Sequence, residues 1–181
     1  AAHLKEDGRS VYAVLNETAP SEPTSLMVLP FLQGMGGTPD VDPNATGLIA
    51  GLTTQTRLPD LYRAILEGVT FEMRYNMEKL SEGNVSINRL LACGGGARSA
   101  VWLQIKADIL GCEIIPVRQE ETGAMGSAIL GLSAVLGESP LKLAEGFWRY
   151  AEPVRPNPEH QAVYHRRYQL YKQLRAFYKE I

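Results

Sequence analysis

Apolar residues along the chain fall into short continuous runs and longer runs with helical spacing. Short, mainly apolar runs bounded by glycine, proline or polar residues predict buried strands. Such runs occupy 26–29, 90–93 and 113–117. Apolar positions three or four residues apart predict amphipathic helices. These occupy 59–82, 97–110, 124–136 and 158–181, and short helical pieces are expected within 1–19. Strands that alternate with helices predict a layered α/β domain.

Helix boundaries can be placed from their start and stop residues. Pro59 fits the first turn of the long helix, and Gly83 ends it. Asn157 is a capping residue followed by Pro158, so the last helix is expected to begin there. The helix at 124–136 is rich in small residues, which predicts close packing against a neighbour.

Two apolar stripes are expected to line the core. In the long helix the stripe consists of Leu61, Ile65, Val69, Met73, Met77 and Leu80. In the last helix it consists of Val163, Leu170, Leu174, Phe177 and Ile181. The basic residues of the last helix are expected on a solvated face that complements the helix dipole. They are Arg166, Arg167, Lys172, Arg175 and Lys179.

Composition narrows the range of functions. The 181 residues suit one domain, and 18 basic against 20 acidic residues give a net charge of −2. Such a balance provides no field for nucleic acid or an anionic membrane, and no apolar run approaches the roughly 20 residues of a membrane span. Cys93 and Cys112 lack metal-site spacing and are expected to be buried, reduced thiols, which fits a cytoplasmic protein.

The sharpest local feature is a strand followed by three glycines and a helix, within 91–110. Glycines allow backbone to approach a ligand closely, because no Cβ intervenes. The following helix offers unpaired N–H groups and the positive end of its dipole, which favour a phosphate. The same pattern also fits a tight turn that binds nothing, so the local sequence leaves both readings open.

Three familiar site patterns do not fit. A P-loop requires a lysine after its glycines, and none follows here. A dinucleotide fingerprint requires glycine at its sixth position and an acid after the next strand, where the chain has Ser99 and then Arg118. A nicotinamide-binding domain is therefore the second choice. No Gly-x-Ser-x-Gly motif indicates a hydrolase.

Two longer motifs resemble the FGGY carbohydrate kinases. The segment 47–52, seven further residues and then 60–67 match the second signature of that family. The glycine turn at 94–99, with Trp102, Gln104, Asp108 and Gly111, resembles the family's ATP loop and helix, and 121–128 resembles its next helix. The resemblance covers nearly the whole chain, and xylulokinase-like members are the most similar.

The resemblance implies a fold and a site. The fold would be part of an actin-like, ribonuclease H-like ATPase lobe, with a mixed sheet flanked by helices. The nucleotide would lie at Gly94, Gly95, Gly96, Ala97 and Ala100. A side chain at Gly96 is expected to intrude on the phosphates, and Ala100 lies near adenine without an amide to bond it. The segment 34–39 lacks the Glu-Arg pair usual in xylulokinases.

The implied activity is magnesium-dependent transfer of the γ-phosphoryl group of ATP to a sugar hydroxyl, of xylulose or a related ketose or polyol. Residues 1–181 would be a partial C-terminal kinase domain, inactive alone, because the catalytic Asp base and the N-terminal lobe would precede residue 1. No catalytic or metal-binding residue is assigned within the chain. The partners implied are the sugar, that lobe and, as an option, a second copy of the protein. A nicotinamide-binding domain and an actin-like domain without catalysis are the alternatives.

Overall fold

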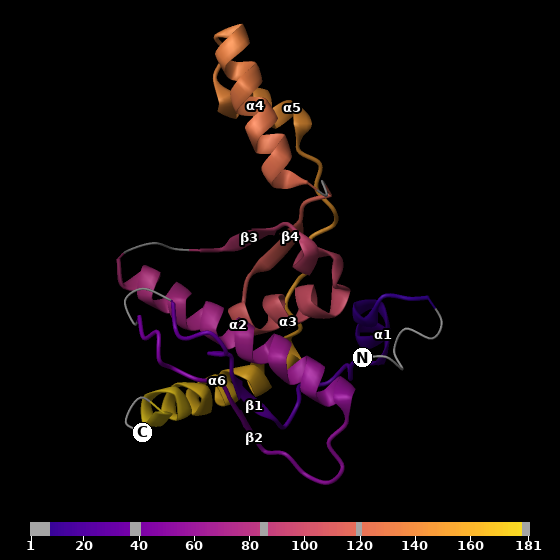
Figure 1. Ribbon diagram of the computed structural model, residues 1–181, viewed down its shortest axis with the longest axis vertical. Helices are drawn as coiled ribbons and strands as arrows, with labels where there is room; N and C mark the ends of the chain where they lie inside the picture. Colours follow the sequence, from indigo (N-terminus) through magenta and orange to yellow (C-terminus); the bar gives the residue numbers. More distant parts are fainter. Residues whose placement is uncertain (1–7, 37–40, 84–86, 119–120, 179–181) are drawn as a thin grey trace.

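The computed structural model describes residues 8–36, 41–83, 87–118 and 121–178 (Figure 1). Helices and strands are mixed along the chain, as the sequence predicts, although β1 and β2 follow each other directly and the chain ends in three helices. In chain order they are α1 (Val11–Thr18), β1 (Met27–Leu29), β2 (Leu48–Ala50), α2 (Leu58–Glu82), β3 (Arg89–Ala92), the 3₁₀ helix η2 (Gly95–Arg98), α3 (Ala100–Leu110), β4 (Glu113–Pro116), α4 (Thr122–Leu136), α5 (Pro140–Phe147) and α6 (Pro158–Tyr178).

The described strands pair as two small sheets. β1 and β2 are antiparallel, with Val28 opposite Ile49, whereas β3 and β4 are parallel, with Leu90 opposite Ile114. The α/β class is therefore confirmed, and both strand orientations occur, in separate sheets. The α2 helix lies close against β1: an added Cβ on Gly68 would come within 2.5 Å of the carbonyl oxygen of Val28. Glycine at this position allows the helix to approach the strand.

The main core lies where α2, α3 and α6 meet β1. Phe71 of α2 is surrounded by three fully buried tyrosines of α6. Its ring centroid lies 6.0 Å from that of Tyr164, 6.0 Å from that of Tyr168 and 5.4 Å from that of Tyr171. Ring pairs at these distances contribute about 0.5–1.5 kcal/mol each beyond the apolar area that they bury.

The predicted core stripes of α2 and α6 were only partly right: Leu61 and Leu174 pack against the core, but other members of the stripes do not. Ile65 and Leu80 of α2 are exposed, as are Leu170 and Phe177 of α6, and Ile181 lies outside the described residues. The buried face of α6 instead consists of Tyr164, Tyr168, Tyr171 and Arg175. That of α2 consists of Arg63, Ala64, Leu66, Glu67, Gly68, Thr70 and Phe71.

Polar residues can occupy these buried faces because they bond one another across the helices. Tyr171 donates its hydroxyl to Oε2 of Glu72 at 2.6 Å, and Tyr168 donates to Oε2 of Glu78 at 2.9 Å. Arg175 was expected in solvent, but it is buried and its guanidinium contacts both oxygens of Glu72, at 3.1 and 3.2 Å. Buried polar groups are tolerated when they are paired in this way.

A second buried pair joins α2 to α6. Oε1 of Glu67 accepts hydrogen bonds from Nε of Arg63 and from the hydroxyl of Tyr164, both at 2.8 Å, and from the amide of Thr24 at 3.1 Å. Burial of the Glu67 carboxyl raises its pKa above the ordinary value, although the hydrogen bond from Tyr164 and the charge of Arg63 oppose this. Loss of either charged partner would leave the other buried without a counterion.

The α4 and α5 helices project away from the rest of the fold (Figure 1). The α4 helix contains no charged residue, yet among its side chains only Ile129 is buried. Its small residues were expected to pack against a neighbour, but an added Cβ on Gly123, Gly126 or Gly131 would meet no described atom within 4 Å. A helix that is apolar all round is normally covered, so the described residues leave an apolar surface here.

Candidate nucleotide-binding turn

The turn between β3 and α3 is fixed by glycine and serine geometry. Gly94 follows Cys93 with φ of 74°, a left-handed conformation that favours glycine. The α3 helix begins at Ala100, not at Ala97 as predicted, because 95–98 form η2. Ser99 caps α3: its Oγ accepts from the amide of Trp102 at 3.2 Å and donates to Oδ1 of Asn16 at 2.6 Å.

The three glycines of the turn have different surroundings. Around Gly95 no described atom lies within 4 Å of an added Cβ, and its φ is not positive, so this backbone faces open space. Gly96 is confined, because an added Cβ would come within 2.6 Å of the Trp102 ring. Gly94 is open in the same way, so a ligand could approach the backbone of the turn at Gly94 and Gly95 but not at Gly96.

Trp102 forms a fixed wall behind Gly96. Its Nε1 donates to Oγ1 of Thr70 on α2 at 3.1 Å. The ammonium of Lys106, one turn further along α3, lies 3.9 Å from the centre of the Trp102 ring, an arrangement typical of cation–π attraction. Burial lowers the pKa of Lys106. These contacts hold the indole ring, and the ring in turn limits the positions open to Gly96.

A hollow of about 240 Å³ lies beside the turn, where the parallel strands β3 and β4 both end. Ligands of α/β sheets bind outside the carboxyl ends of parallel strands, so this position suits a binding site. Two of the predicted site residues line it, Gly94 and Ala97; Gly95, Gly96 and the exposed Ala100 do not. The other lining residues are Arg98, Pro116, Val117, Arg118 and Ala151.

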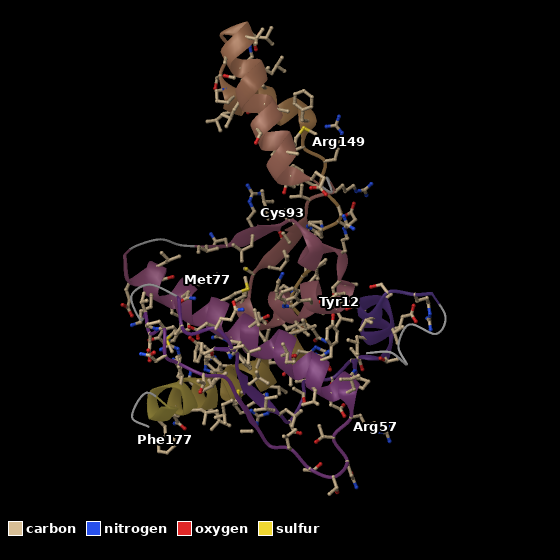
Figure 2. The ribbon with its side chains drawn as sticks, viewed as in Figure 1. Tyr12, Arg57, Met77, Cys93, Arg149 and Phe177 are labelled. Carbon is tan, nitrogen blue, oxygen red and sulfur yellow. The ribbon has the colours of Figure 1, made fainter. Side chains whose placement is uncertain are left out.

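The returning chain at 149–154 completes this edge of the sheet. Ala151 donates its amide to the carbonyl of Pro116 at 2.8 Å, and the amide of Arg118 donates to the carbonyl of Arg149 at 2.9 Å. Cys93 and Arg149 are labelled in Figure 2, near the base of the projecting helices. Cys93 is exposed, contrary to prediction, whereas Cys112 is buried as predicted.

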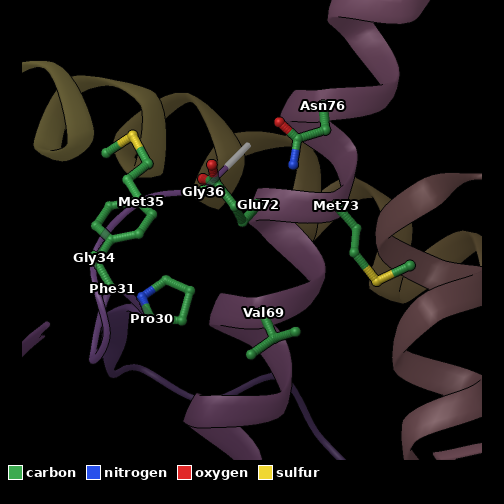
Figure 3. A pocket seen from close by; sticks show the side chains of 9 residues that line it. All are labelled: Pro30, Phe31, Gly34, Met35, Gly36, Val69, Glu72, Met73 and Asn76. Atoms are coloured by element: carbon green, nitrogen blue, oxygen red, sulfur yellow. The ribbon is translucent and has the colours of Figure 1, made fainter. Parts of the chain in front are cut away.

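A second hollow, of about 290 Å³, lies between the segment 30–36 and the middle of α2 (Figure 3). Pro30, Val69 and Met73 give it apolar walls, with the Glu72 carboxylate and the Asn76 amide as its polar groups. The Glu72 carboxylate is already bonded to Tyr171 and Arg175. Residues 37–39 of the segment 34–39, which lacks the Glu-Arg pair usual in xylulokinases, are outside the described residues.

His160 and Asp108 have structural partners. Nδ1 of His160 lies 2.9 Å from Oδ2 of the buried Asp108, whose Oδ1 accepts from the Asn157 amide at 2.7 Å. These contacts anchor the start of α6 on α3. In the described part of the chain, no three His, Cys, Asp or Glu side chains gather in a way that could hold a metal ion. Nor does any described helix have the length and apolar character needed to span a membrane.

Comparison with known proteins gives a consistent result. The profile of the FGGY family of carbohydrate kinases, C-terminal domain, matches residues 1–135. The chain is 31% identical to xylulose kinase of Bacillus subtilis, covering 91% of this chain and 33% of that protein. It is 32% identical to ribulokinase of Geobacillus thermodenitrificans, covering 98% of this chain and 34% of the relative.

A solved structure supports the same relationship. The fold matches that of xylulose kinase from Rhodospirillum rubrum with a TM-score of 0.79 and 28% identity, covering 95% of this chain and 35% of that one. The chain thus spans about a third of the length of the relatives that it matches. The resemblance drawn from the motifs and the ATPase-lobe fold are both confirmed.

Proposed function

Since the chain belongs to the FGGY family of carbohydrate kinases through their C-terminal domain, we propose that it is the nucleotide-binding part of an ATP-dependent sugar kinase. In this proposal the γ-phosphoryl group of ATP is transferred to a sugar hydroxyl. Phosphoryl transfer depends mainly on positioning and charge stabilisation, so the part of the enzyme that holds the phosphates is central to it.

One observation carries the proposal: the open backbone at Gly95, beside a hollow at the ends of two parallel strands. A side chain at this position would fill space that the described residues leave empty. Gly94, Gly95 and Ala97 would approach the nucleotide through their backbone, and Gly96 would hold the turn against Trp102. The role of Ala100 is the least constrained, since it is exposed on the first turn of α3.

The sugar is proposed to be xylulose or a related ketose, because relatives of the chain are named xylulose kinase and ribulokinase. No carboxylate among the described residues lines the hollow beside the turn, and the base that accepts the sugar proton is proposed to lie outside the chain. The N-terminal lobe of the same polypeptide would provide it together with most sugar contacts. A second copy of the protein is the other partner considered.

Mg²⁺ is expected for this reaction, but the described residues do not fit a metal site of their own. No step of the proposal is therefore assigned to a metal held by this chain. Carboxylate oxygens are the usual protein ligands of Mg²⁺ in kinases, alongside the phosphates, and any such ligands would belong to the rest of the enzyme.

The exposed apolar surface of α4 supports a further part of the proposal. Leu130 and Val135 are 63% and 83% exposed, and Leu91 on the outer side of β3 is 56% exposed. Exposed apolar area of this kind marks an interaction site. We propose that other parts of the same polypeptide cover it, because the relatives are about three times as long as this chain.

A thermal-shift comparison tests the proposal. ATP with Mg²⁺ is expected to raise the melting temperature of the chain in a concentration-dependent manner, whereas NAD⁺ is expected to leave it unchanged, because only a bound ligand stabilises the folded state. Stabilisation by NAD⁺ and not by ATP would favour the dinucleotide-binding alternative and overturn the proposal. At the place where a dinucleotide site needs an acid, the chain has Arg118.

A further inference from the structure

The walls of the hollow beside the glycine turn carry positive charge from two sides. Arg98 is the last residue of η2, and Arg118 stands just beyond β4; both line the hollow with Gly94. None of the described residues that line it is acidic. The chain as a whole has a net charge of −2, so this concentration of cations is local.

We propose that this hollow is a phosphate-binding site and that Arg98 and Arg118 bind the phosphate groups of the nucleotide. The inference rests on the proposed function and assigns side chains to a site that the motifs describe only through its glycines. Guanidinium groups suit the task because their planar fork of N–H donors matches phosphate oxygens in pairs. A phosphate bound between Arg98 and Arg118 would also occupy the open space beside the glycine turn.

The backbone at Arg118 is fixed before any ligand binds. On one side Val117 donates its amide to the carbonyl of Ala92 at 2.8 Å, which extends the pairing of β4 with β3. On the other side Arg118 itself donates to Arg149. A residue held from both sides loses little further backbone freedom on binding, which favours affinity.

Arg98 is held at the opposite wall. It ends η2 and is followed by Ser99, whose Oγ caps α3 and bonds Asn16. The two arginines therefore line the hollow from two different segments, the end of η2 and the residues just beyond β4. The guanidinium of Arg149 donates to the carbonyl oxygens of Gly146 and Trp148, at 3.1 and 3.0 Å, and thereby closes the end of α5. It is not assigned to the site.

The test is calorimetric titration of the 181-residue chain with ATP and, separately, with adenosine, which lacks phosphates. Arg118→Ala and Arg98→Ala are each expected to weaken ATP binding at least tenfold and to leave adenosine binding within twofold of the unmodified chain. Arg118→Lys keeps the positive charge but loses the paired N–H donors of the guanidinium. Its ATP affinity is expected to lie between that of the unmodified chain and that of Arg118→Ala. Arg89→Ala is the matched control, because Arg89 is exposed at the opposite end of β3.

The outcomes separate this inference from the proposed function. If the unmodified chain binds ATP and both arginine variants bind it equally well, the arginine assignment is wrong while the proposed function stands. If the variants weaken ATP and adenosine equally, the contact is not with phosphate and the inference is also overturned. If the unmodified chain binds neither ligand, the proposed function itself fails.

Discussion

Gly96 lies against the indole ring of Trp102 so closely that an added Cβ would come within 2.6 Å of Cζ3. The ring has little room to move, since its Nε1 is bonded to Thr70 and Lys106 lies over its face. The conformation of the glycine turn is therefore coupled to the packing of α2 against α3. A side chain at Gly96 would meet the protein itself, in addition to any ligand.

The first prediction concerns this contact. Gly96→Val is expected to lower the free energy of unfolding by about 1–3 kcal/mol, the usual cost of overpacking. Gly95→Ala, on the open side of the same turn, is expected to change it by less than about 0.5 kcal/mol. Urea unfolding followed by circular dichroism provides the comparison, and equal stability of both variants would show that Trp102 does not confine Gly96.

The second prediction concerns the buried carboxyl of Glu67. Its pKa is raised in the folded protein, so the folded state binds more protons than the unfolded state as pH rises above about 4.5. Its contribution to stability is therefore complete below that pH and is lost as pH rises through the raised pKa. The quantity to follow is the free energy of unfolding of the unmodified chain minus that of Glu67→Gln. We expect this difference to fall as pH rises from 4.5 through the raised pKa of Glu67.

Urea titrations at pH 4.5 to 8, run in parallel on both proteins, would measure that difference. All other titrating groups are shared by the two proteins, so their effects cancel. A difference that rises with pH would mean that the pKa of Glu67 is lowered, and that its pairing with Arg63 and Tyr164 outweighs burial.

The sequence predicts the order of most elements correctly, and the buried faces of α2 and α6 poorly. Apolar spacing is visible along one helix, but the bond between Arg63 and Tyr164 joins residues 101 positions apart. Taken as isolated residues, Arg63, Glu67 and Arg175 would be expected in solvent. Their partners on another helix offset the cost of burying them. Two short elements, β2 and α5, were missed because each is too brief for a period to stand out.

The candidate site was predicted in part for the same reason. A run of three glycines after a strand is visible in the sequence. The different roles of the three glycines are not visible there, because those roles depend on Trp102 and on the empty space at Gly95. In the sequence, Arg118 stands out only as the residue at the place where a dinucleotide site needs an acid. Its place beside Gly94 follows from the parallel pairing of β3 with β4, which brings the ends of both strands together.

The third prediction concerns the apolar surface of α4. Val135→Lys is expected to leave the free energy of unfolding of the chain within about 0.5 kcal/mol and to reduce self-association in sedimentation velocity, because Val135 has little contact with the described residues. Ile129→Lys, at the buried position of the same helix, is expected to destabilise the helix pair. If Val135→Lys is as destabilising as Ile129→Lys, the surface is already covered within the chain.

The fourth prediction concerns catalysis. The 181-residue chain is expected not to phosphorylate xylulose, because transfer requires nucleophile, base and phosphates to be held together and no carboxylate of the described ranges lines the hollow beside the turn. A coupled assay for ADP, with ATP, Mg²⁺ and xylulose, is the measurement. Xylulose-dependent ADP formation by the purified chain would place the base within it and contradict this account.

The most direct test of the central claim is the ATP affinity of Gly95→Val, measured by calorimetry beside its melting temperature. The account predicts at least a tenfold loss of affinity, about 1.4 kcal/mol, in a protein that melts close to the unmodified chain, because the new side chain extends into space that only a ligand would occupy. Gly146→Ala, a similarly open glycine on α5, should keep full affinity. Unchanged ATP affinity in a folded Gly95→Val protein would mean that the turn does not hold the nucleotide.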